Sequence, residues 1–313
     1  DFAALVDQQT LLSDYPYADA VERNVLIYGE KLRAALGTTS DRAAVQTELM
    51  RALTDGPGIV VFKRAFGDLS VVDRATEAFL GRIAAEKAAG VAGGDHFAKP
   101  GANDRVWGAL GKLAVAEPAV FAEYYANDII ALISESWLGP GYQVTSQVNV
   151  VNPGGQAQTA HRDYHLGFMD ADASARYPAQ VHRLSPAMTL QGAVAHCDMP
   201  VETGPTLYLP YSHQYELGYL AFHLPEFTEY FQQHYTQLPL DIESLRTAWD
   251  ALPLEEVDRA AKAAEFADWP NPSDELVRSG LSLVLEEGQA AGLGTVGDLE
   301  RAIRRLPEHA DKM

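Results

Sequence analysis

Between residues 142 and 210, short runs of apolar and β-branched residues alternate with Gly- and Pro-rich turns. The runs are expected to form strands at 142–151, 187–198 and 206–210, and the turns fall at 152–155 and 200–205. Many short strands punctuated in this way are typical of a barrel or a double-sheet jelly roll, and less so of a parallel sheet. No Gly-rich phosphate loop follows any of these runs, which weakens a nucleotide-binding interpretation. The pattern therefore predicts a β core, either a barrel or a double-sheet jelly roll, near residues 140–240.

Helical patterns flank this β core on both sides. Val45, Leu49 and Leu53 recur at i, i+4 and i+8 and form one apolar stripe of a helix. Residues 1–55 are expected to be helical, with further helices at 68–89 and 118–137, a short buried strand at 59–62 and a polar, turn-rich loop at 95–107. The sequence thus predicts an α+β fold packed as one domain. Its parts are a helical region from 1 to 139, the β core from 140 to 240, and a helical tail from 241 to 313.

The chain has 313 residues, a net charge of −19 and one cysteine, Cys197. The acidic charge argues against nucleic acid or an anionic membrane as a partner. A single cysteine excludes an intrachain disulfide framework. No apolar run reaches the roughly 18 residues that span a bilayer, and residues 1–20 lack a signal-peptide pattern. We therefore expect a cytoplasmic protein.

The segment Gln156–Phe168 contains the pair His161-x-Asp163. In an extended chain successive side chains alternate between faces, so His161 and Asp163 project to the same side. An imidazole beside a carboxylate makes up two thirds of the 2-His-1-carboxylate triad, which holds non-haem Fe(II) and leaves positions open for substrate and O₂. We therefore take His161 and Asp163 as candidate metal ligands and catalytic residues. The alternative is a structural His–Asp pair.

Residues 142–151 have a period-two pattern that separates an apolar face from a polar one. Val144 and Val148 share one face of the expected strand. The other face carries Gln143, Thr145, Gln147 and Asn149. An amide-rich face favours a polar pocket over a hydrophobic core, and the alternative is an ordinary solvated surface.

Several stretches together resemble the phytanoyl-CoA dioxygenase family. They are Asn152-Pro-Gly-Gly, then Gln156–Phe168 with its His161-Arg-Asp163, then Leu190–Asp198 and Glu202–His213, and together they lie within residues 140–240. The resemblance implies a double-stranded β-helix that binds Fe(II) and 2-oxoglutarate, uses O₂ and hydroxylates a small organic molecule. It places His161 and Asp163 at the first two iron ligands of the family. It also places His213 in a turn whose His is ordinarily not a ligand.

On this resemblance, Gln147 and Asn149 become candidates for contacts to 2-oxoglutarate or to the substrate, with structural amides as the alternative. Thr206 is a weaker candidate for the same role. The expected partner is a small-molecule substrate, and the oligomeric state stays open.

The chain departs from the family pattern after Leu240. Beyond this point the family has its third iron ligand, which is a second His, and an Arg that binds the distal carboxylate of 2-oxoglutarate. Here Gln237-Leu-Pro-Leu240 has the pattern of a lead-in to a strand, but Asp241 begins a helical pattern with no His before His309. A jelly roll without its last strands would leave open sheet edges, so we predict a chain gap between Leu240 and Asp241. The alternative is a degenerate, non-catalytic small-molecule-binding barrel; in a continuous chain, His213 is the remaining candidate for the third ligand.

The chain lacks the residues that other catalytic classes require. A kinase catalytic loop requires Asn five residues after the Asp of His-Arg-Asp, where this chain has Phe168. The zinc-hydrolase pattern His-Glu-x-x-His is absent. Cys197 lies in the apolar run 187–198, where a cysteine is usually an inert core residue rather than a nucleophile.

Overall fold

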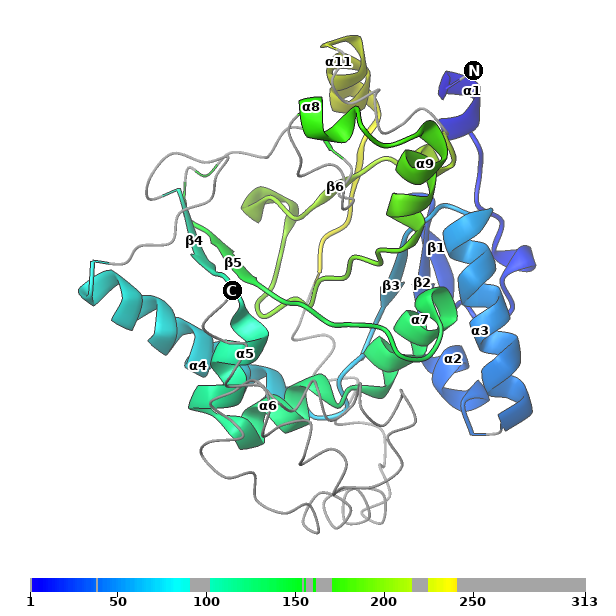
Figure 1. The fold of residues 1–313 in the computed structure, drawn as a ribbon. Coiled ribbons are helices and arrows are strands. Elements are labelled where there is room, and N and C mark those ends of the chain that lie inside the picture. The colour runs from blue at the N-terminus through cyan, green and yellow to red at the C-terminus, as the bar shows by residue number, and fades with distance from the viewer. Residues whose placement is uncertain are drawn as a thin grey trace. The chain divides into compact units, whose positions relative to one another are not determined.

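The computed structural model describes residues 2–37, 39–90, 102–153, 155, 160–161, 171–215 and 225–240. These residues belong to two compact units, whose elements are labelled in Figure 1. The first unit consists of Asp1–Ala65, Asp128–Gly139 and Ala157–Leu245, and the second of Phe66–Asn127, Pro140–Gln156 and Arg246–Met313. The packing of all parts as one domain stays a prediction.

A three-stranded sheet lies in the first unit. β1 (Ala20–Glu22) pairs antiparallel with β2 (Val25–Tyr28), and β2 pairs in parallel with β3 (Val60–Phe62). Arg23 and Asn24 connect the first two strands with φ angles of 48° and 73°. Positive φ at both positions is the requirement of a type I′ hairpin turn.

The prediction that residues 1–55 are entirely helical is therefore wrong. The strand expected at 59–62 is confirmed by β3, although its residues are only partly buried. All four residues of β2 are apolar and buried. A continuous apolar run of this length fits a central strand and a buried helical turn equally well. Only the pairing with β1 and β3 decides between the two.

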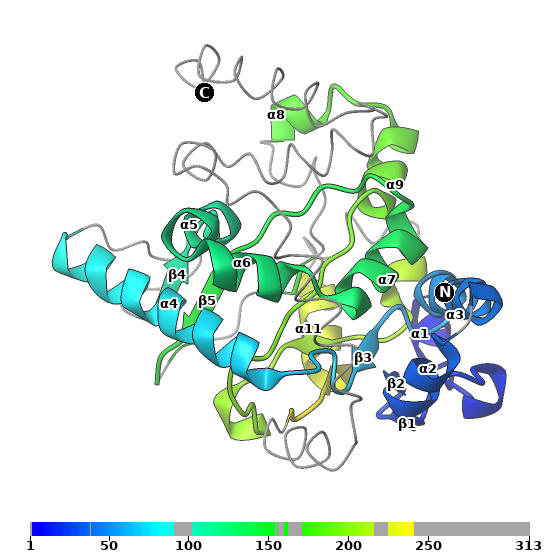
Figure 2. The same cartoon turned by 90° about the horizontal axis from the view of Figure 1, so that it is seen from below.

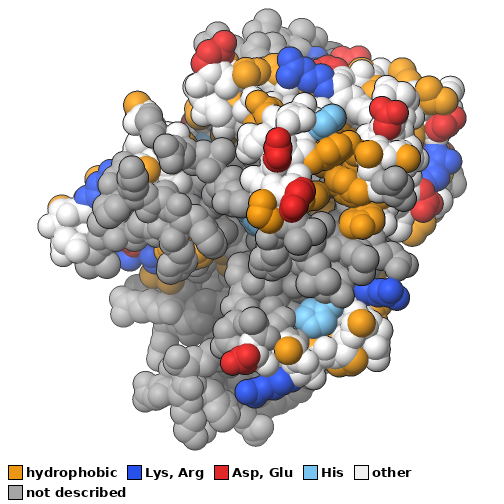
Figure 3. Space-filling model, turned by 90° about the horizontal axis from the view of Figure 1, so that it is seen from above, with side chains coloured by type: hydrophobic (Ala, Val, Ile, Leu, Met, Phe, Trp, Pro, Cys, Tyr) orange, Lys and Arg blue, Asp and Glu red, His pale blue; other side chains and the backbone are white. Residues whose placement is uncertain are grey.

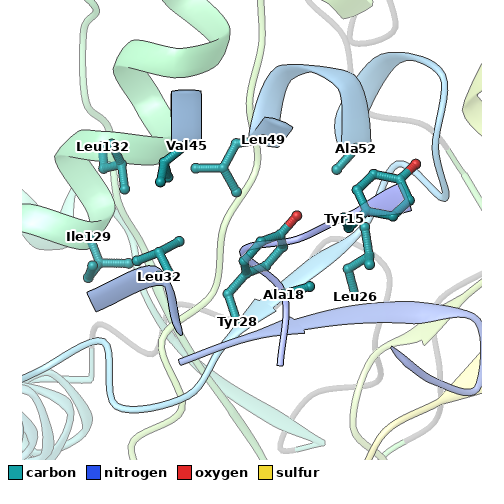
Figure 4. Packing of buried hydrophobic residues seen from close by; sticks show 10 residues of the cluster. All are labelled: Tyr15, Ala18, Leu26, Tyr28, Leu32, Val45, Leu49, Ala52, Ile129 and Leu132. Carbon is teal, nitrogen blue, oxygen red and sulfur yellow. The ribbon is translucent and has the colours of Figure 1, made fainter. Parts of the chain in front are cut away.

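The main core of the first unit lies among this sheet and the helices α2 (Glu30–Ala35), α3 (Thr39–Thr54) and α7 (Asp128–Leu138). The apolar stripe predicted for α3 is confirmed, because Val45 and Leu49 are fully buried. Figure 4 shows these side chains pointing toward residues of the other elements. The cluster consists of Tyr15, Ala18, Leu26, Tyr28, Leu32, Val45, Leu49, Ala52, Ile129 and Leu132.

The other elements of the first unit are short. They are α1 (Phe2–Val6), η1 (Leu12–Asp14), α8 (Ala171–Ser174), α9 (Ala179–Ala187), η3 (Val201–Thr203), β6 (Leu207–Tyr208), η4 (Ser212–Gln214), α11 (Pro225–His234) and β7 (Thr236–Gln237). β6 and β7 pair antiparallel, and Met199 forms an antiparallel bridge with Leu240.

The apolar run 187–198 does not form the buried strand that its composition predicts. α9 ends at Ala187, the residues that follow are irregular, and Met188 is 69% exposed. Cys197 is exposed as well, so its expected burial is wrong. The run is rich in Ala and contains Gly, and both lack the side-chain bulk that stabilises strands. Apolar side chains do reach the surface of this protein, where Figure 3 shows a group of them beside acidic ones.

The second unit contains a long helix with two shorter helices along it. α4 (Leu69–Ala88) begins after Asp68, whose side chain accepts a hydrogen bond from the backbone N–H of Ser70. Such N-caps satisfy a backbone donor that has no partner within the helix. α5 (Ala109–Ala116) and α6 (Pro118–Tyr125) pack against α4 (Figure 2).

The single helix predicted over 118–137 is instead two helices, α6 and α7, separated by Ala126 and Asn127. Ala126 has a ψ angle of 34°, which is outside the helical region. Asn127 directly precedes α7, a position where Asn is a preferred capping residue.

A two-stranded sheet completes the described part of the second unit. β4 (Asn103–Val106) pairs antiparallel with β5 (Val148–Val151). The strand predicted at 142–151 is therefore shorter than expected, but burial alternates along this whole stretch with the predicted period of two. β4 lies in the stretch 95–107, where a loop is expected, so that part of the prediction is wrong.

The described residues combine helices with sheets of three, two and two strands, none of which closes into a barrel. The mixed α+β class is confirmed, whereas the double-stranded β-helix at 140–240 is not. The helical tail predicted at 241–313 lies outside the described residues. No helix within the described ranges is long and apolar enough to cross a membrane.

Candidate functional site

His161 belongs to the first unit, and its side chain is exposed. Asp163, the other member of the predicted pair, lies outside the described residues. The common face of the two side chains therefore stays a prediction. Among the residues that the structure describes, no group of three or more His, Cys, Asp or Glu side chains is placed to hold a metal ion.

Gln147 and Asn149 have exposed side chains on one side of the second unit's sheet, as the period-two pattern predicts. Arg105 of β4 lies directly opposite Asn149 in the strand register. Its Nη1 donates a hydrogen bond of 3.5 Å to Oε1 of Gln147, and its guanidinium carbon lies 4.9 Å from the ring centroid of Trp107. We call the surface formed by Arg105, Trp107, Gln147 and Asn149 the outer face of the β4–β5 sheet.

The opposite side of this sheet is packed and charge-paired. Val106 is fully buried there, opposite Val148. Asp104 accepts a hydrogen bond of 2.7 Å from Lys87 of α4 and one of 3.2 Å from Nδ2 of Asn152. The hydrogen bond from Lys87 holds the pKa of Asp104 below its usual value. The sheet thus separates a structural inner side from a polar outer face.

The sequence patterns do not identify Arg105 and Trp107 as site residues, because residues 95–107 have the polar, turn-rich composition of a loop. The signal that could have found them is the spacing of Asn103, Arg105 and Trp107 at every second position. A run this short does not distinguish a strand from a loop until its partner strand is known.

Thr206 belongs to the first unit, where it is exposed and directly precedes β6. Gln147 and Asn149 belong to the second unit. The three residues predicted to contact 2-oxoglutarate or substrate are therefore divided between the units, and the two amides share a face with Arg105.

The Tyr211–Gln214 turn packs against residues 54–58 of the same unit. Three hydrogen bonds join them, from Nε2 of His213 to the Thr54 carbonyl (3.1 Å), from Nε2 of Gln214 to the Gly56 carbonyl (3.0 Å) and from the Tyr211 N–H to the Pro57 carbonyl (2.9 Å). A Cβ added at Gly58 would overlap the His213 ring at Nδ1. Both ring nitrogens of His213 therefore face backbone, which supports a structural role and argues against this His as the third metal ligand.

Leu240 has an extended, paired backbone. Its N–H donates to the carbonyl of Met199 at 3.0 Å, and its carbonyl accepts from the N–H of Met199 at 2.8 Å. This pairing agrees with Gln237–Leu240 as the lead-in to a strand. Asp241 and His309 lie outside the described residues, so the gap between Leu240 and Asp241 stays a prediction.

Comparison with known proteins supports the resemblance seen in the sequence. The family model described as Phytanoyl-CoA dioxygenase (PhyH) matches residues 37–265, which is most of the chain. No curated protein and no solved structure matches. The matched range contains the His161-x-Asp163 motif, the outer face of the β4–β5 sheet and the Tyr211–Gln214 turn, and it extends well to the N-terminal side of the motif stretches. The chain therefore belongs to the phytanoyl-CoA dioxygenase family.

Proposed function

We propose that this protein is an Fe(II)- and 2-oxoglutarate-dependent dioxygenase that hydroxylates a small organic molecule. The observation that carries the proposal is the family match over residues 37–265, a range that contains the His161-x-Asp163 motif. A non-catalytic protein that binds a small molecule could share the same family sequence. The experiment below separates the two.

The donor chemistry of the motif fits iron. Imidazole nitrogen and carboxylate oxygen are the ligand types that non-haem Fe(II) takes in the facial triad. The exposed side chain of His161 is accessible to an ion from solvent. His213 does not fit, because its ring nitrogens face the backbone of Thr54 and Gly58.

In this proposal His161 and Asp163 hold the metal through a ring nitrogen and a carboxylate oxygen. Bound Fe(II), with 2-oxoglutarate and O₂, would supply the oxidising chemistry that replaces a C–H hydrogen with a hydroxyl group. Gln147 and Asn149 contribute amide N–H groups that donate to oxygen atoms of the co-substrate or substrate. The Thr206 hydroxyl is a weaker candidate for the same role.

We further propose that the missing His ligand and the Arg for 2-oxoglutarate belong to a segment lost between Leu240 and Asp241. The paired, extended backbone at Leu240 supports this, because it agrees with Gln237–Leu240 as the lead-in to a strand. Reading the gene across these two codons tests the idea. Contiguous codons would refute this idea and leave the iron site with two assigned ligands and no third.

Iron binding and 2-oxoglutarate turnover test the main proposal. The wild-type protein should bind about one Fe(II) per chain and, with ascorbate and O₂, convert 2-oxoglutarate into succinate. His161→Ala and Asp163→Ala should each lose most of the bound iron, because a triad without one ligand loses its chelate geometry. His234→Ala is the matched control. That imidazole is also exposed in the first unit but stacks on Tyr230 at 4.0 Å, outside the motif.

Unchanged iron content in both motif variants would refute the ligand assignment. Iron binding without any 2-oxoglutarate binding, measured by calorimetry on the protein encoded by the uninterrupted gene, would favour the non-catalytic binding protein. Loss of iron in the His234→Ala variant would show that the assay responds to any lost imidazole.

A further inference from the structure

A pocket of about 520 Å³ lies beside α1 in the first unit. Its wall contains residues of α1, the β1–β2 turn, the segment after β6, α11 and β7. Small organic ligands occupy pockets of about 300–1,000 Å³. The described residues of this wall do not include any of the candidates for contacts to iron, 2-oxoglutarate or substrate. We call it the α1 pocket.

The α1 side of the pocket is held in place at both of its ends. At one end the Phe2 ring packs against Phe227 and Tyr230 of α11, with ring centroids 5.4 and 5.6 Å apart (Figure 1). At the other end the carbonyl of Gln8 accepts a hydrogen bond of 2.7 Å from Nδ2 of Asn24 in the β1–β2 turn. A pocket whose wall is fixed in advance loses less conformational entropy when a ligand binds.

Most polar side chains of the wall are bonded to the backbone of their own fold. Asn24 donates to the Gln8 carbonyl and accepts from the N–H of Thr10 at 2.6 Å. The Thr236 hydroxyl donates to a carbonyl of the β1–β2 turn at 3.3 Å. Nδ1 of His234 donates to a carbonyl of α11 at 2.8 Å. These three side chains therefore have a structural role.

Asp7 differs from them, because its carboxylate is exposed on the wall and has no ion pair or hydrogen bond within the described part of the chain. No Lys or Arg is among the described lining residues. The pocket therefore favours a positive charge. Val6, Leu209 and Pro210 make another part of the wall apolar.

We propose that the α1 pocket binds a small organic cation, namely a protonated amine with an apolar or aromatic body. An ammonium group has up to three N–H donors, and the ionised carboxylate of Asp7 is an acceptor for them. The body of the ligand packs against Val6 and Leu209. This inference does not rest on the proposed function, because the pocket shares no described residue with the candidate site.

Titration of the full chain with benzylamine, and separately with benzyl alcohol, tests the pocket by ligand-observed saturation-transfer NMR at pH 7. The two probes have the same aromatic body, but only benzylamine is charged. Benzylamine should bind saturably and more tightly than benzyl alcohol. Its affinity should fall as the salt concentration rises, because an exposed charge pair is screened.

Asp7→Asn should weaken benzylamine binding by about three- to fivefold and leave benzyl alcohol unchanged, because it removes the charge and keeps the size of the side chain. Glu229→Gln is the matched control. It removes one negative charge from an exposed side chain of α11 that does not line the pocket, so benzylamine should bind it like the wild type.

Ala3→Leu tests the location of the bound probe. Ala3 lines the pocket, and Leu fills space there while remaining a good helix former. Both probes should therefore bind this variant more weakly. Urea unfolding of each variant checks that the fold is intact.

Four results would overturn the proposal. The first is the absence of saturable benzylamine binding to the wild type, and the second is benzyl alcohol binding as tightly as benzylamine. The third is an equal loss of affinity in Asp7→Asn and Glu229→Gln, which would attribute the effect to net charge. The fourth is unchanged binding to Ala3→Leu, which would place the probe elsewhere. If benzylamine binds as expected but succinate never forms, the proposed function fails and the amine site stands.

Discussion

Two polar regions of this protein use similar side chains in opposite ways. In the first unit, the Tyr211–Gln214 turn directs its polar groups at the backbone of residues 54–58. In the second unit, Gln147 and Asn149 on the outer face of the β4–β5 sheet are exposed. Both regions contain an amide, an aromatic ring and a basic group.

The difference lies in the partners that the surroundings offer. A buried polar group must find its partner within the protein, since leaving it unsatisfied costs about 1–3 kcal/mol. An exposed polar group bonds to water and can exchange that water for a ligand. A histidine or amide in a family motif therefore indicates ligand binding only when its partners are not the backbone of its own fold. By this criterion His213 holds the fold, whereas the exposed amides Gln147 and Asn149 stay candidates for ligand contacts.

Gly58→Ala should have the largest effect on the turn. Gly58 has a φ angle of +73°, and a Cβ at this position would overlap the His213 ring. A left-handed backbone costs a non-glycine residue roughly 1–2 kcal/mol, and overpacking adds about 1–3 kcal/mol. We therefore expect the free energy of unfolding to fall by about 2–5 kcal/mol, measured by urea unfolding.

Gly81→Ala in α4 is the control for this substitution. Nothing lies within 4 Å of a Cβ added at Gly81, and Ala stabilises a helix interior by about 0.5–1 kcal/mol relative to Gly. If Gly58→Ala unfolds at the same urea concentration as the wild type, the contact between the turn and residues 54–58 does not stabilise the fold.

Tyr211→Phe should have a smaller effect on the same region. The Thr10 hydroxyl donates to the carbonyl of Asn24 at 2.8 Å, so the buried Tyr211 hydroxyl donates to Oγ1 of Thr10, also at 2.8 Å. Losing this hydrogen bond should lower the free energy of unfolding by about 1 kcal/mol. A double-mutant cycle with Thr10→Val isolates the pair, and a coupling energy near zero would show that the two hydroxyls do not stabilise the fold.

Glu48→Gln should change the pH dependence of stability rather than its value in acid. Glu48 is 5% exposed, and its carboxylate accepts hydrogen bonds from the N–H of Tyr17 at 3.2 and 3.3 Å. Burial raises its pKa above the usual 4.5, and the hydrogen bond from Tyr17 offsets only part of this shift. The folded state thus holds the proton more tightly than the unfolded chain, so the free energy of unfolding falls as pH rises from 4.5 through the raised pKa.

The Gln variant has no proton to lose, so its stability should vary less with pH in that window. Urea unfolding at a series of pH values measures both slopes. Equal slopes for wild type and variant would mean that this buried carboxyl does not contribute to the pH dependence.

Gln147→Ala and Asn149→Ala should have the smallest effect on stability. Because both side chains are exposed, the free energy of unfolding should change by less than about 0.5 kcal/mol in each variant. A stability loss as large as that of Tyr211→Phe would show that these amides hold the fold, and the contrast between the two regions would disappear.

Local periodicity is the part of this fold that the amino-acid pattern predicts well. The stripe of Val45 and Leu49 on α3 and the alternating burial along 142–151 both follow from backbone geometry, which repeats every 3.6 residues in a helix and every two in a strand. The run 187–198 shows the limit, because apolar composition without a pairing partner did not make it a buried strand.

The sequence by itself determined the family and the candidate ligands, because the motif around His161 and Asp163 is local. It can be recognised without knowing which distant residues it contacts. Only the tertiary structure decided that Arg105 stands opposite Asn149, and that His213 lies against Thr54. These partners are separated by long stretches of chain, 159 residues in the case of His213 and Thr54. The physical reason is that φ and ψ preferences fix the spacing of neighbours along the chain, whereas distant pairs form only where packing and hydrogen bonding outweigh the entropy of closing the loop between them.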